Sequence, residues 1–344
     1  MDLAVIIVNW NVRDLLRRCL ASLTRSARLG GLTMTTIVVD NASRDGSADM
    51  VRAEFPDVRL VASERNLGFT AGNNLGLRAL SEYPENNLPR YVLFLNPDTE
   101  IIGDALATMV RYLDAHPAVG IVGPQLCYPD GTVQSSRRRF PRLATAFFES
   151  TLLQRGWPRN GILRRYYMAD MPDDAEQEVD WLVGACLLVR HAALAEVGGF
   201  DEGFFMYSEE LDWCRRARAV GWRAVYLPSA QVLHYEGKSS EQVIPARHIH
   251  FQASKVRYFR KYHGRLAAEI LRLFLLATYV YQWGEEGVKW VLGHKRALRA
   301  ERMRAYGQVL RSRLNIPNLS RDDFAPTPHP PPERGRAGGG MEHR

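Results

Sequence analysis

The chain has 344 residues, 46% of them hydrophobic, and a formal net charge of +7. This composition excludes a disordered or fibrous protein and suffices for one large α/β domain with appendages or for two domains. Four widely spaced cysteines without a C-x-x-C pair argue against a zinc site or a disulfide framework, and the start "MDLAVIIVNWN" lacks the features of a signal peptide, so a cytoplasmic protein is expected.

The charge is distributed unevenly along the chain. Residues 1–254 carry 27 Lys/Arg and 30 Asp/Glu, whereas residues 255–344 carry 18 and 8. Any basic partner surface is therefore expected in the carboxy-terminal part. A nucleic-acid-binding protein is one interpretation of this charge, but no recognised motif accompanies it and the first 254 residues are slightly acidic, so no nucleic-acid partner is expected.

Strand and helix patterns alternate through the first hundred residues. Continuous apolar runs predict strands over 4–10, 35–43, 58–64 and 91–95, and apolar residues at helical spacing predict helices over 13–27, over 47–55 and after a loop within 65–83. Alternation at this spacing predicts a mostly parallel, doubly wound, Rossmann-like α/β sheet.

Beyond residue 100 the pattern is less regular. It predicts a helix over 101–117, a strand from 119, a mixed irregular segment over 134–180, and then a strand, a helix, a loop, a second helix and a last strand that ends near His234. The segment from 266 to 292 is apolar with helical spacing, and the Pro- and Gly-rich end predicts an unstructured tail.

Asparagine and aspartate side chains follow three of the predicted strands: Asn9, Asn11, Asp40, Asn41, Asn96 and Asp98. Ligands bind at the carboxyl ends of strands in open α/β sheets, so these side chains are expected to line one crevice. Such a crevice suits a nucleotide, and Asp40 could accept from a base N–H or a ribose hydroxyl. The alternative is that "DNAS" is a turn in which these side chains stabilise their own backbone.

The stretch "ERNLGFTAGNNLG", residues 64–76, is rich in glycine and asparagine between a strand and a helix. Glycines and a helix amino terminus could approach a phosphate closely. The spacing matches neither G-x-G-x-x-G nor a P-loop, and a plain turn with a helix cap explains the stretch equally well.

Asn96-Pro97-Asp98 resembles a D-x-D arrangement, in which two oxygen-bearing side chains flank a divalent cation that also binds a diphosphate. Mg²⁺ and Mn²⁺ prefer oxygen ligands and commonly use one or two carboxylates plus substrate phosphates. Asp98 is therefore the better ligand, and Asn96 could instead hydrogen-bond ribose.

The segment from Gly198 to Trp222 concentrates acidic residues, among them Glu209, Glu210 and Asp212. Some of these need be only helix-start acids or solvated partners of nearby arginines. Two consecutive carboxylates after the apolar "FFMY" run are nevertheless expected at a helix amino terminus facing the crevice, where one of them could act as a general base.

His234 ends the last predicted strand, in "VLHYEGKSS". A single histidine can be a structural hydrogen-bonding group, but a neutral imidazole at a strand end could also complete a metal shell. Lys238 and the serines beside it could meet phosphate.

Six stretches occur in a specific order: "VIIVNWN", "IVVDNASRDGS", "NLGFTAGNNLG", "FLNPDTE", "LVGACLLVRHAALAEVGGFDEGFFMYSEELDWCRRARAVGW" and "VLHYEGKSS". Together they resemble a family 2 glycosyltransferase of the GT-A fold, in the rhamnosyltransferase-like branch, over roughly residues 3–240. The resemblance implies a GT-A domain with a C-terminal helical extension. It also implies an inverting transfer of a hexose from a nucleotide-diphosphate sugar with Mg²⁺ or Mn²⁺.

The resemblance implies roles for individual residues. The nucleotide sugar would be bound by Asn9, Asn11, Asp40, Asn66, Gly68, Asn73 and Asn96. Asp98 and His234 would hold the metal, with Asn96 in the place of the first acid. Glu210, where the family usually has an Asp, would be the base in preference to Glu209 or Asp212. The acceptor would meet Asp212, Trp181 and Gly184.

The implied reaction transfers L-rhamnose from dTDP-rhamnose to a saccharide or polyprenyl-linked saccharide in cell-surface polysaccharide assembly. The preference for rhamnose rests on the resemblance alone, so a UDP-hexose donor stays open. The departures at Asn96 and Glu210 also leave open an inactive homologue that binds sugar nucleotides. The expected organisation is a catalytic domain over 1–250 (nucleotide-sugar half about 1–125, acceptor half about 126–250), a helical extension over 251–320 and the unstructured tail over 321–344.

Residues 255–292 begin basic and continue apolar. The uninterrupted apolar run from Leu273 to Tyr281 is far below the roughly 20 residues that span a bilayer. The pattern favours an amphipathic helix at the inner face of the cell membrane, with basic residues that touch anionic head groups: Lys255, Arg257, Arg260, Lys261 and Arg265. The alternative is that this segment packs against the catalytic domain, or against a second copy in a homo-oligomer.

Overall fold

The structure is a computed structural model that describes residues 1–237 and 244–315. The predictions for Lys238, for the serines beside it and for the tail over 321–344 lie outside the described residues.

A curled nine-stranded sheet forms the centre of the catalytic half, in the order β3-β2-β1-β4-β10-β6-β11-β5 with β8 beside β11. Its strands are β1 (Leu3–Asn9), β2 (Met34–Asn41), β3 (Arg59–Ser63), β4 (Tyr91–Leu95), β5 (Thr99–Ile101), β6 (Val119–Cys127), β8 (Gln177–Val179), β10 (Cys186–Arg190) and β11 (Arg223–His234). Only β10, β5 and β8 run opposite to the other strands of this sheet within the described chain. A separate two-stranded pair joins β7 (Arg137–Arg138) to β9 (Trp181–Leu182).

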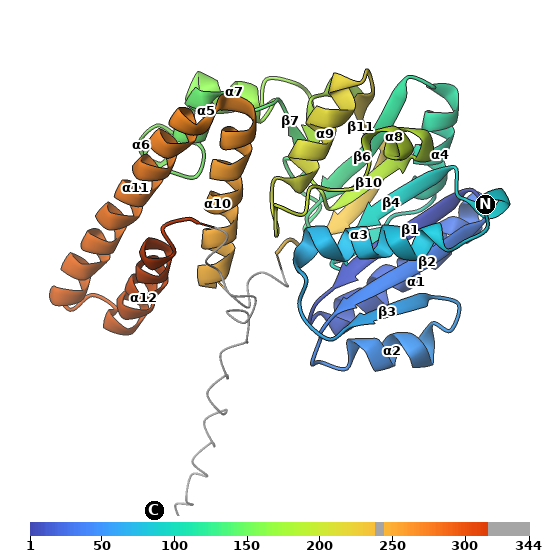
Figure 1. Cartoon of the computed structure of the whole chain (residues 1–344), viewed down its shortest axis with the longest axis horizontal. Helices are drawn as coiled ribbons and strands as arrows, with labels where there is room; N and C mark the ends of the chain where they lie inside the picture. Colours follow the sequence, from blue (N-terminus) through green and yellow to red (C-terminus); the bar gives the residue numbers. More distant parts are fainter. Residues whose placement is uncertain (238–243, 316–344) are drawn as a thin grey trace, which may run out of the picture.

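Helices cover both faces of the sheet (Figure 1). One face carries α1 (Arg13–Gly30), α2 (Ser47–Glu54) and α4 (Ala105–Ala115); the other carries α3 (Gly68–Ser81), α8 (His191–Val197) and α9 (Glu209–Ala219). Side chains alternate along a strand, so Val5 and Ile7 of β1 join the core under α1 while Ile6 and Val8 join the core under α3. Strands covered on both faces are apolar throughout, which explains the continuous runs in the sequence.

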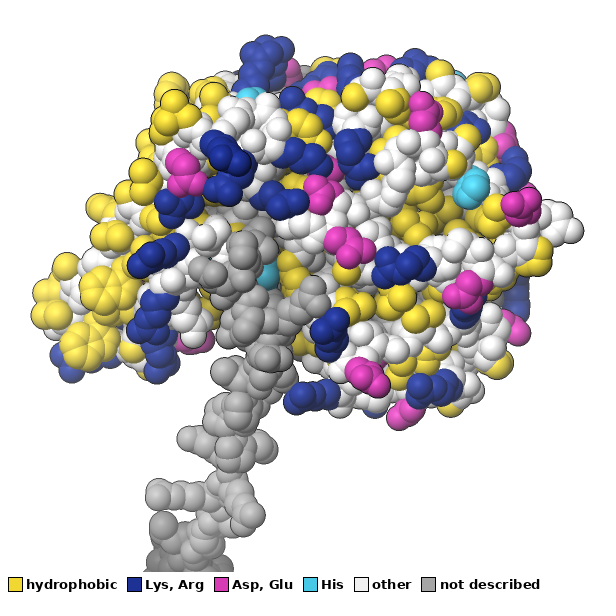
Figure 2. All heavy atoms as spheres, in the orientation of Figure 1, with side chains coloured by type: hydrophobic (Ala, Val, Ile, Leu, Met, Phe, Trp, Pro, Cys, Tyr) yellow, Lys and Arg dark blue, Asp and Glu magenta, His cyan; other side chains and the backbone are white. Residues whose placement is uncertain are grey.

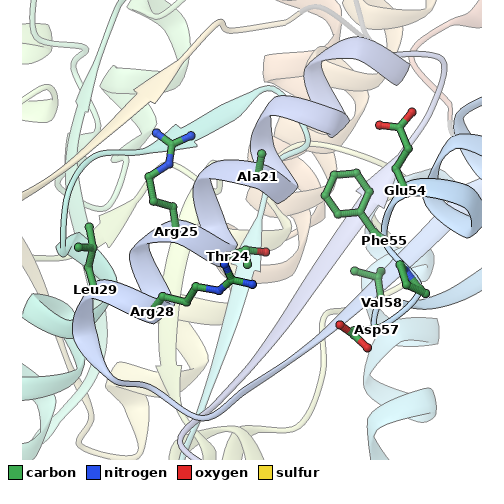
Figure 3. A pocket seen from close by; sticks show the side chains of 10 residues that line it. Ala21, Thr24, Arg25, Arg28, Leu29, Glu54, Phe55, Asp57 and Val58 are labelled. Carbon is green, nitrogen blue, oxygen red and sulfur yellow. The ribbon is translucent and has the colours of Figure 1, made fainter.

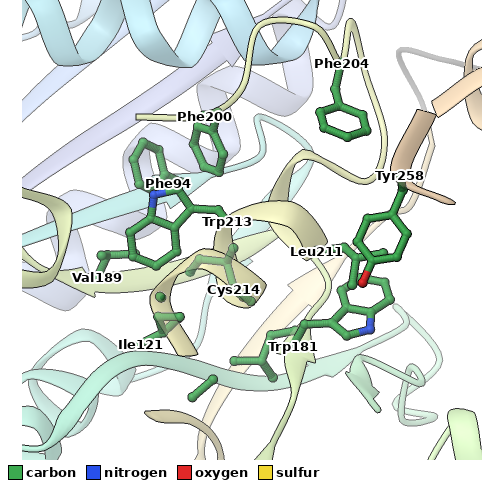
Figure 4. Packing of buried hydrophobic residues seen from close by; sticks show 14 of the residues in the cluster. Phe94, Ile121, Trp181, Val189, Phe200, Phe204, Leu211, Trp213, Cys214 and Tyr258 are labelled. Carbon is green, nitrogen blue, oxygen red and sulfur yellow. The ribbon is translucent and has the colours of Figure 1, made fainter. Parts of the chain in front are cut away.

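A second group of helices stands beside the sheet (Figure 1). It contains the short helices α5 (Leu143–Phe148), α6 (Leu152–Gly156) and α7 (Gly161–Tyr166) and the long helices α10 (Ile244–His263), α11 (Arg265–Val291) and α12 (Arg296–Ser312). Aromatic and aliphatic side chains join the two groups: Tyr258 of α10 lies beside Leu211 of α9 and Trp181 (Figure 4). None of the helices in the described ranges is long and apolar enough to cross a bilayer.

The sequence interpretation was incomplete in three places. Residue 101, where a helix was expected to begin, is the last residue of β5, and α4 begins at Ala105. The segment over 134–180, predicted to be irregular, contains short helices and strands, and a 3-10 turn, η1 (Glu85–Asn87), precedes β4. β5 has only three residues and exists because it pairs with β11, in a register that sets Thr99 opposite His234. A strand this short is defined by its partner, which the local sequence does not reveal.

Lys255 also corrects the membrane expectation. Its side chain is only 6% exposed, and its ammonium lies 3.0 Å from a carboxylate oxygen of Glu149 and donates to the Glu149 carbonyl at 2.8 Å. Lys255 therefore holds α10 against α5 and cannot touch lipid head groups.

Candidate active site

One cavity of about 240 Å³ lies at the carboxyl ends of β1 and β4, between the end of β11 and the start of α9. It is lined by eight of the residues predicted for the site: Asn66, Gly68, Asn96, Asp98, Gly184, Glu209, Glu210 and His234. These residues come from distant parts of the chain. The structure thus brings together the side chains that the sequence assigned to metal binding and to base catalysis.

His234 faces Asp98 across one wall of this cavity. Because His234 lies opposite Thr99 in the antiparallel register of β11 and β5, its imidazole comes beside the residue that precedes Thr99. Nε2 of His234 lies 3.5 Å from Oδ1 of Asp98, and both side chains are buried.

Gln134, which the sequence interpretation did not single out, fixes the imidazole of His234. Its amide nitrogen donates to the backbone carbonyl of His234 at 2.6 Å, so its amide oxygen faces Nδ1 of the ring at 2.9 Å. An amide oxygen can only accept, so Nδ1 carries a proton, and in the neutral form of the ring Nε2 is the nitrogen that keeps a lone pair. Nε2 has no hydrogen-bond partner among the described residues. In that form two acceptors, this nitrogen and the Asp98 carboxylate, face each other, an arrangement that suits a cation between them.

The donor set of Asp98 and His234 fits a divalent cation that a substrate also holds. Carboxylate oxygen and imidazole nitrogen are both metal ligands, and ions such as Mg²⁺ commonly use one or two carboxylates plus substrate phosphates. Within 1–237 and 244–315, no three His, Cys, Asp or Glu side chains are grouped to hold a metal by themselves. The buried Oδ1 of Asn96 makes no hydrogen bond in that part of the chain and lies in the same cavity wall. A metal bound here would therefore need oxygens from a ligand.

Glu209 and Glu210 open α9 and line the same cavity. Burial raises the pKa of both carboxyls, and the charge of Glu210 adds to this effect, so that the pKa of Glu209 lies well above its ordinary value. Backbone hydrogen bonds from Gly184 and Leu211 oppose the rise in the pKa of Glu210, because they favour its ionised form. Of the two carboxyls, Glu209 therefore has the pKa that is raised further, and it holds its proton more tightly than Glu210 does.

The loop that leads into α9 has a strained backbone. Tyr207 and Ser208 have φ values of +69° and +65°, a conformation that residues other than glycine adopt rarely and that clusters at functional sites. Two residues earlier, the carbonyl of Phe205 accepts from the N–H of Phe69 at 3.0 Å. Gly68 has φ +82°, and a Cβ there would lie 2.7 Å from Phe205. Glycine is required at this position because the two loops meet there.

Asn9 and Asp40 do not line the cavity but form a buried hydrogen-bonded cluster at the ends of β1 and β2. Nδ2 of Asn9 donates to Oδ1 of Asp40 and to Oγ of Ser43, both at 3.1 Å, and the second Asp40 oxygen accepts from the N–H of Ser43 at 3.0 Å. Oδ1 of Asn11 accepts from the N–H of Arg44 at 2.7 Å. These bonds shape the loop after β2, as the turn interpretation of this stretch predicts.

Asn41, the neighbour of Asp40, reaches the cavity instead. Its Nδ2 donates to Oδ1 of Asn66 at 2.9 Å and to the carbonyl of Gly68 at 3.1 Å, and its Oδ1 accepts from the N–H of Leu67 at 2.8 Å. Asn41 therefore orients the loop that carries two of the predicted nucleotide-binding residues.

Asn73 and Trp181 also lie outside the cavity lining. Nδ2 of Asn73 donates to the carbonyl of Phe69 at 2.9 Å, one turn back in its own helix. The indole of Trp181 donates to the carbonyl of Arg139 at 3.0 Å and packs in the core that Figure 4 shows.

Asp212 is fully buried at the contact between α9 and α10. Its carboxylate accepts from Nε of Arg216 at 2.9 Å and from the hydroxyl of Tyr262 at 2.8 Å, and Nζ of Lys261 lies 2.6 Å away. Asp212 therefore joins the catalytic half to the extension and does not line the cavity.

A larger hollow of about 610 Å³ lies away from all the predicted site residues (Figure 3). It is formed by α1 and the segment that follows α2, with Arg25 and Arg28 on one side and Phe55 and Asp57 on the other. It holds no grouping of catalytic side chains, so its size does not make it the site.

A mannosyltransferase from Pyrobaculum calidifontis, solved in complex with GDP-Man and Mn²⁺, has a similar architecture. The alignment covers 91% of this chain and 86% of that chain, with a TM-score of 0.50 and 17% sequence identity, so the likeness concerns the fold alone. The curled sheet with helices on both faces and the cavity at its strand ends have the architecture of a GT-A glycosyltransferase, and the predicted fold class is confirmed.

Sequence comparisons give the family. The model described as Glycosyl transferase family 2 matches residues 4–197. The chain is 30% identical over 307 residues to an N-acetylglucosaminyl-diphospho-decaprenol L-rhamnosyltransferase from Mycobacterium tuberculosis, which covers 88% of this chain and 92% of the relative. It is 32% identical over 172 residues to the Rhamnosyltransferase WbbL of Escherichia coli, in an alignment that covers 49% of this chain and 61% of the relative. The chain belongs to glycosyl transferase family 2.

Proposed function

We propose that the protein transfers L-rhamnose from dTDP-rhamnose to a hydroxyl of a lipid-linked saccharide in cell-surface polysaccharide assembly, with inversion at the anomeric carbon and with a divalent cation. One observation carries the reaction type: the pair of Asp98 and His234 and the pair of Glu209 and Glu210 line one cavity. The sugar and the acceptor are supported by the Mycobacterium tuberculosis relative, whose name joins L-rhamnosyl transfer to N-acetylglucosaminyl-diphospho-decaprenol.

Asp98 and His234 would hold the cation, with the amide oxygen of Asn96 beside them. When bound, the cation supplies positive charge that stabilises the leaving diphosphate. Gln134 keeps the proton on Nδ1 of His234, so that Nε2 stays available as a ligand.

Glu210 would take the proton from the acceptor hydroxyl as that oxygen attacks the anomeric carbon. Backbone hydrogen bonds from Gly184 and Leu211 favour its ionised form, while burial raises its pKa above the ordinary value, as a general base requires. Glu209, whose pKa burial and the neighbouring Glu210 raise further, would keep its proton and add no second negative charge next to the base. Direct displacement inverts the anomeric carbon and needs a single base, unlike the two carboxylate roles of a retaining glycosidase.

The test is a transfer assay with dTDP-rhamnose, an N-acetylglucosaminyl-diphospho-polyprenol acceptor and Mn²⁺ or Mg²⁺. Glu210→Gln is expected to lower kcat at least ~100-fold, because the proton acceptor is lost, while dTDP-rhamnose still binds. The matched control, Glu209→Gln, keeps a neutral group in place and is expected to stay within about tenfold of the parent rate. Parent-like turnover of Glu210→Gln contradicts the base assignment, and turnover of UDP-hexoses in place of dTDP-rhamnose contradicts the sugar.

We also propose that α11 lies on the inner face of the cell membrane. Its outward side is a stripe of exposed residues at helical spacing: Leu266, Ile270, Leu273, Ala277, Val280, Tyr281, Val288 and Val291. In Figure 2 apolar side chains gather along the edge of the molecule where α11 runs, with Lys and Arg beside them. Exposed Arg265, Lys295 and Arg296 flank the stripe. Apolar surface bordered by positive charge suits an anionic lipid surface better than a second copy of the same positive surface.

Sedimentation with vesicles separates these possibilities. The parent is expected to sediment with phosphatidylglycerol vesicles and to stay in solution with phosphatidylcholine vesicles, and a double substitution of Leu273→Asp and Val280→Asp should abolish sedimentation. The matched control, Leu29→Asp, changes an exposed leucine on α1 and should leave sedimentation unchanged. A parent that ignores both vesicle types and forms a dimer that the double substitution dissociates would assign the stripe to a homo-oligomer.

A further inference from the structure

The α10 helix contributes a cation to the candidate active site. Arg247 lies near the start of α10 and lines the cavity together with Asn66, Asp98 and His234. Among the described residues that line the cavity, it is the one Arg or Lys, against four acids: Asp98, Glu209, Glu210 and Glu236. Helix α10 therefore supplies positive charge that the other described residues of the lining do not.

Arg247 makes no hydrogen bond or ion pair within the part of the chain that the structure describes. It is half-buried, although four acidic side chains line the same cavity. A guanidinium in such a place gains most from a ligand with several anionic oxygens, because its planar fork matches phosphate geometry.

Neighbouring contacts hold this part of α10 against the cavity. The His250 ring stacks on Phe205, with ring centroids 4.5 Å apart, and Oγ of Ser254 donates to the carbonyl of Met206 at 2.8 Å. Both partners belong to the loop that leads into the acid pair of α9. The backbone that carries Arg247 is therefore fixed relative to the catalytic side chains, which lowers the entropy lost when it binds a ligand.

We propose that Arg247 binds the diphosphate of the nucleotide-sugar donor and stabilises the charge that builds on it as the sugar leaves. This assignment rests on the proposed function. A diphosphate is present in the donor and also in the proposed lipid-linked acceptor, but the donor is favoured because Asp98 and His234, the candidate cation ligands, line the same cavity as Arg247. Helix α10 then belongs to the donor site, in addition to packing against the loop that leads into α9.

Calorimetric titration with dTDP and Mn²⁺ tests the assignment without turnover. Arg247→Ala is expected to bind dTDP about 10- to 100-fold more weakly than the parent, because charge-assisted hydrogen bonds are lost. Arg247→Lys keeps the charge but loses the planar guanidinium, so its affinity for dTDP should lie between those of the parent and Arg247→Ala. Arg304→Ala removes an exposed arginine of α12, in the same group of helices, and should bind dTDP like the parent.

The outcomes separate this inference from the proposed function. If the parent binds dTDP and Arg247→Ala binds it equally well, the Arg247 assignment is wrong while the proposed function stands. If Arg247→Ala raises only the KM for the lipid-linked acceptor, the guanidinium serves the acceptor diphosphate and the donor assignment is wrong. If the parent binds no dTDP, the proposed donor and this inference fail together. Melting temperatures equal to that of the parent show that the variants are folded.

Discussion

The replacement of Asp212 by asparagine tests whether this residue joins two parts of the molecule or binds the acceptor. The substitution keeps the shape of the side chain and removes its negative charge. The carboxylate is fully buried, with Arg216 and Lys261 both within 2.9 Å. Asp212→Asn therefore leaves two positive charges facing a neutral amide at the contact between α9 and α10.

The stability that Asp212→Asn should lose depends on how exposed Arg216 and Lys261 are. Removing one member of a fully buried ion pair costs about 3–5 kcal/mol. Arg216 and Lys261 are 26% and 33% exposed, so water screens part of this loss. Both also keep other partners: Lys261 lies 2.8 Å from Asp201, and Arg216 donates to two backbone carbonyls. We therefore expect a loss of about 2–3 kcal/mol in the free energy of unfolding.

Urea unfolding of the parent, Asp212→Asn and the control Asp201→Asn measures the loss. Asp201 shares Lys261 but is partly exposed, so its substitution should cost about 1 kcal/mol or less. At a temperature where all three proteins are folded, Asp212→Asn should keep the acceptor KM of the parent. Unchanged stability together with a raised KM for the acceptor would show that Asp212 does not hold α9 and α10 together, and it would support the acceptor contact that the family resemblance implied.

Three further substitutions test single features of the site. The folded state binds the proton of Glu209 more tightly than the unfolded chain does, so the free energy of unfolding falls as the pH rises from 4.5 towards the raised pKa of Glu209. Glu209→Gln should reduce this fall. Urea midpoints of Glu209→Gln that change between pH 4 and pH 8 as much as those of the parent would contradict the raised pKa. Gly68→Ala should lower the free energy of unfolding by about 2 kcal/mol or more, because φ is positive at this position and the added Cβ meets Phe205. Gly31→Ala, where φ is also positive but the added Cβ meets nothing, should lower it by about 1 kcal/mol. Equal losses in denaturant unfolding would show that the contact with Phe205 has no effect. Gln134→Leu should weaken Mn²⁺ binding about 10- to 100-fold in titrations followed by electron paramagnetic resonance, and an unchanged affinity would exclude its hold on the imidazole.

The strands of the nucleotide half could be predicted because they are buried on both faces. The run from Tyr91 to Leu95 is β4 without an error at either end, and Asp98 follows it into the cavity as expected from its place at a strand end. The direction of each side chain was harder to predict. Asp40 and Asn41 are neighbours on one strand, so they point to opposite sides, and the sequence does not say which side carries the cavity.

Gln134 and Arg247 could not be predicted, for a different reason. Each depends on residues that are distant in the chain. Gln134 holds the imidazole of His234, 100 residues later, and Arg247 lines a cavity whose other walls come mainly from earlier segments. Neither stands in a motif or at a strand end. Their positions depend on the way that the segment after β6 and helix α10 pack on the catalytic half, which no local pattern encodes.

The same packing explains why two of the lysines that the sequence assigned to a membrane surface face acids of the protein instead. Lys255 and Lys261 are predicted from the sequence to be solvated positive charges. In the structure Lys255 faces Glu149 at the end of α5, and Lys261 faces Asp201 and Asp212 beside α9. Burying the carboxylate of Asp212 is costly unless Lys261 stays beside it, so α10 is held in one position relative to α9. That position carries Arg247 to the cavity and leaves α11 as the outer helix. The contacts that hold α10 in place therefore also bring to the cavity the guanidinium that we propose for the donor site, and they leave exposed the apolar side of α11 that we propose for the membrane.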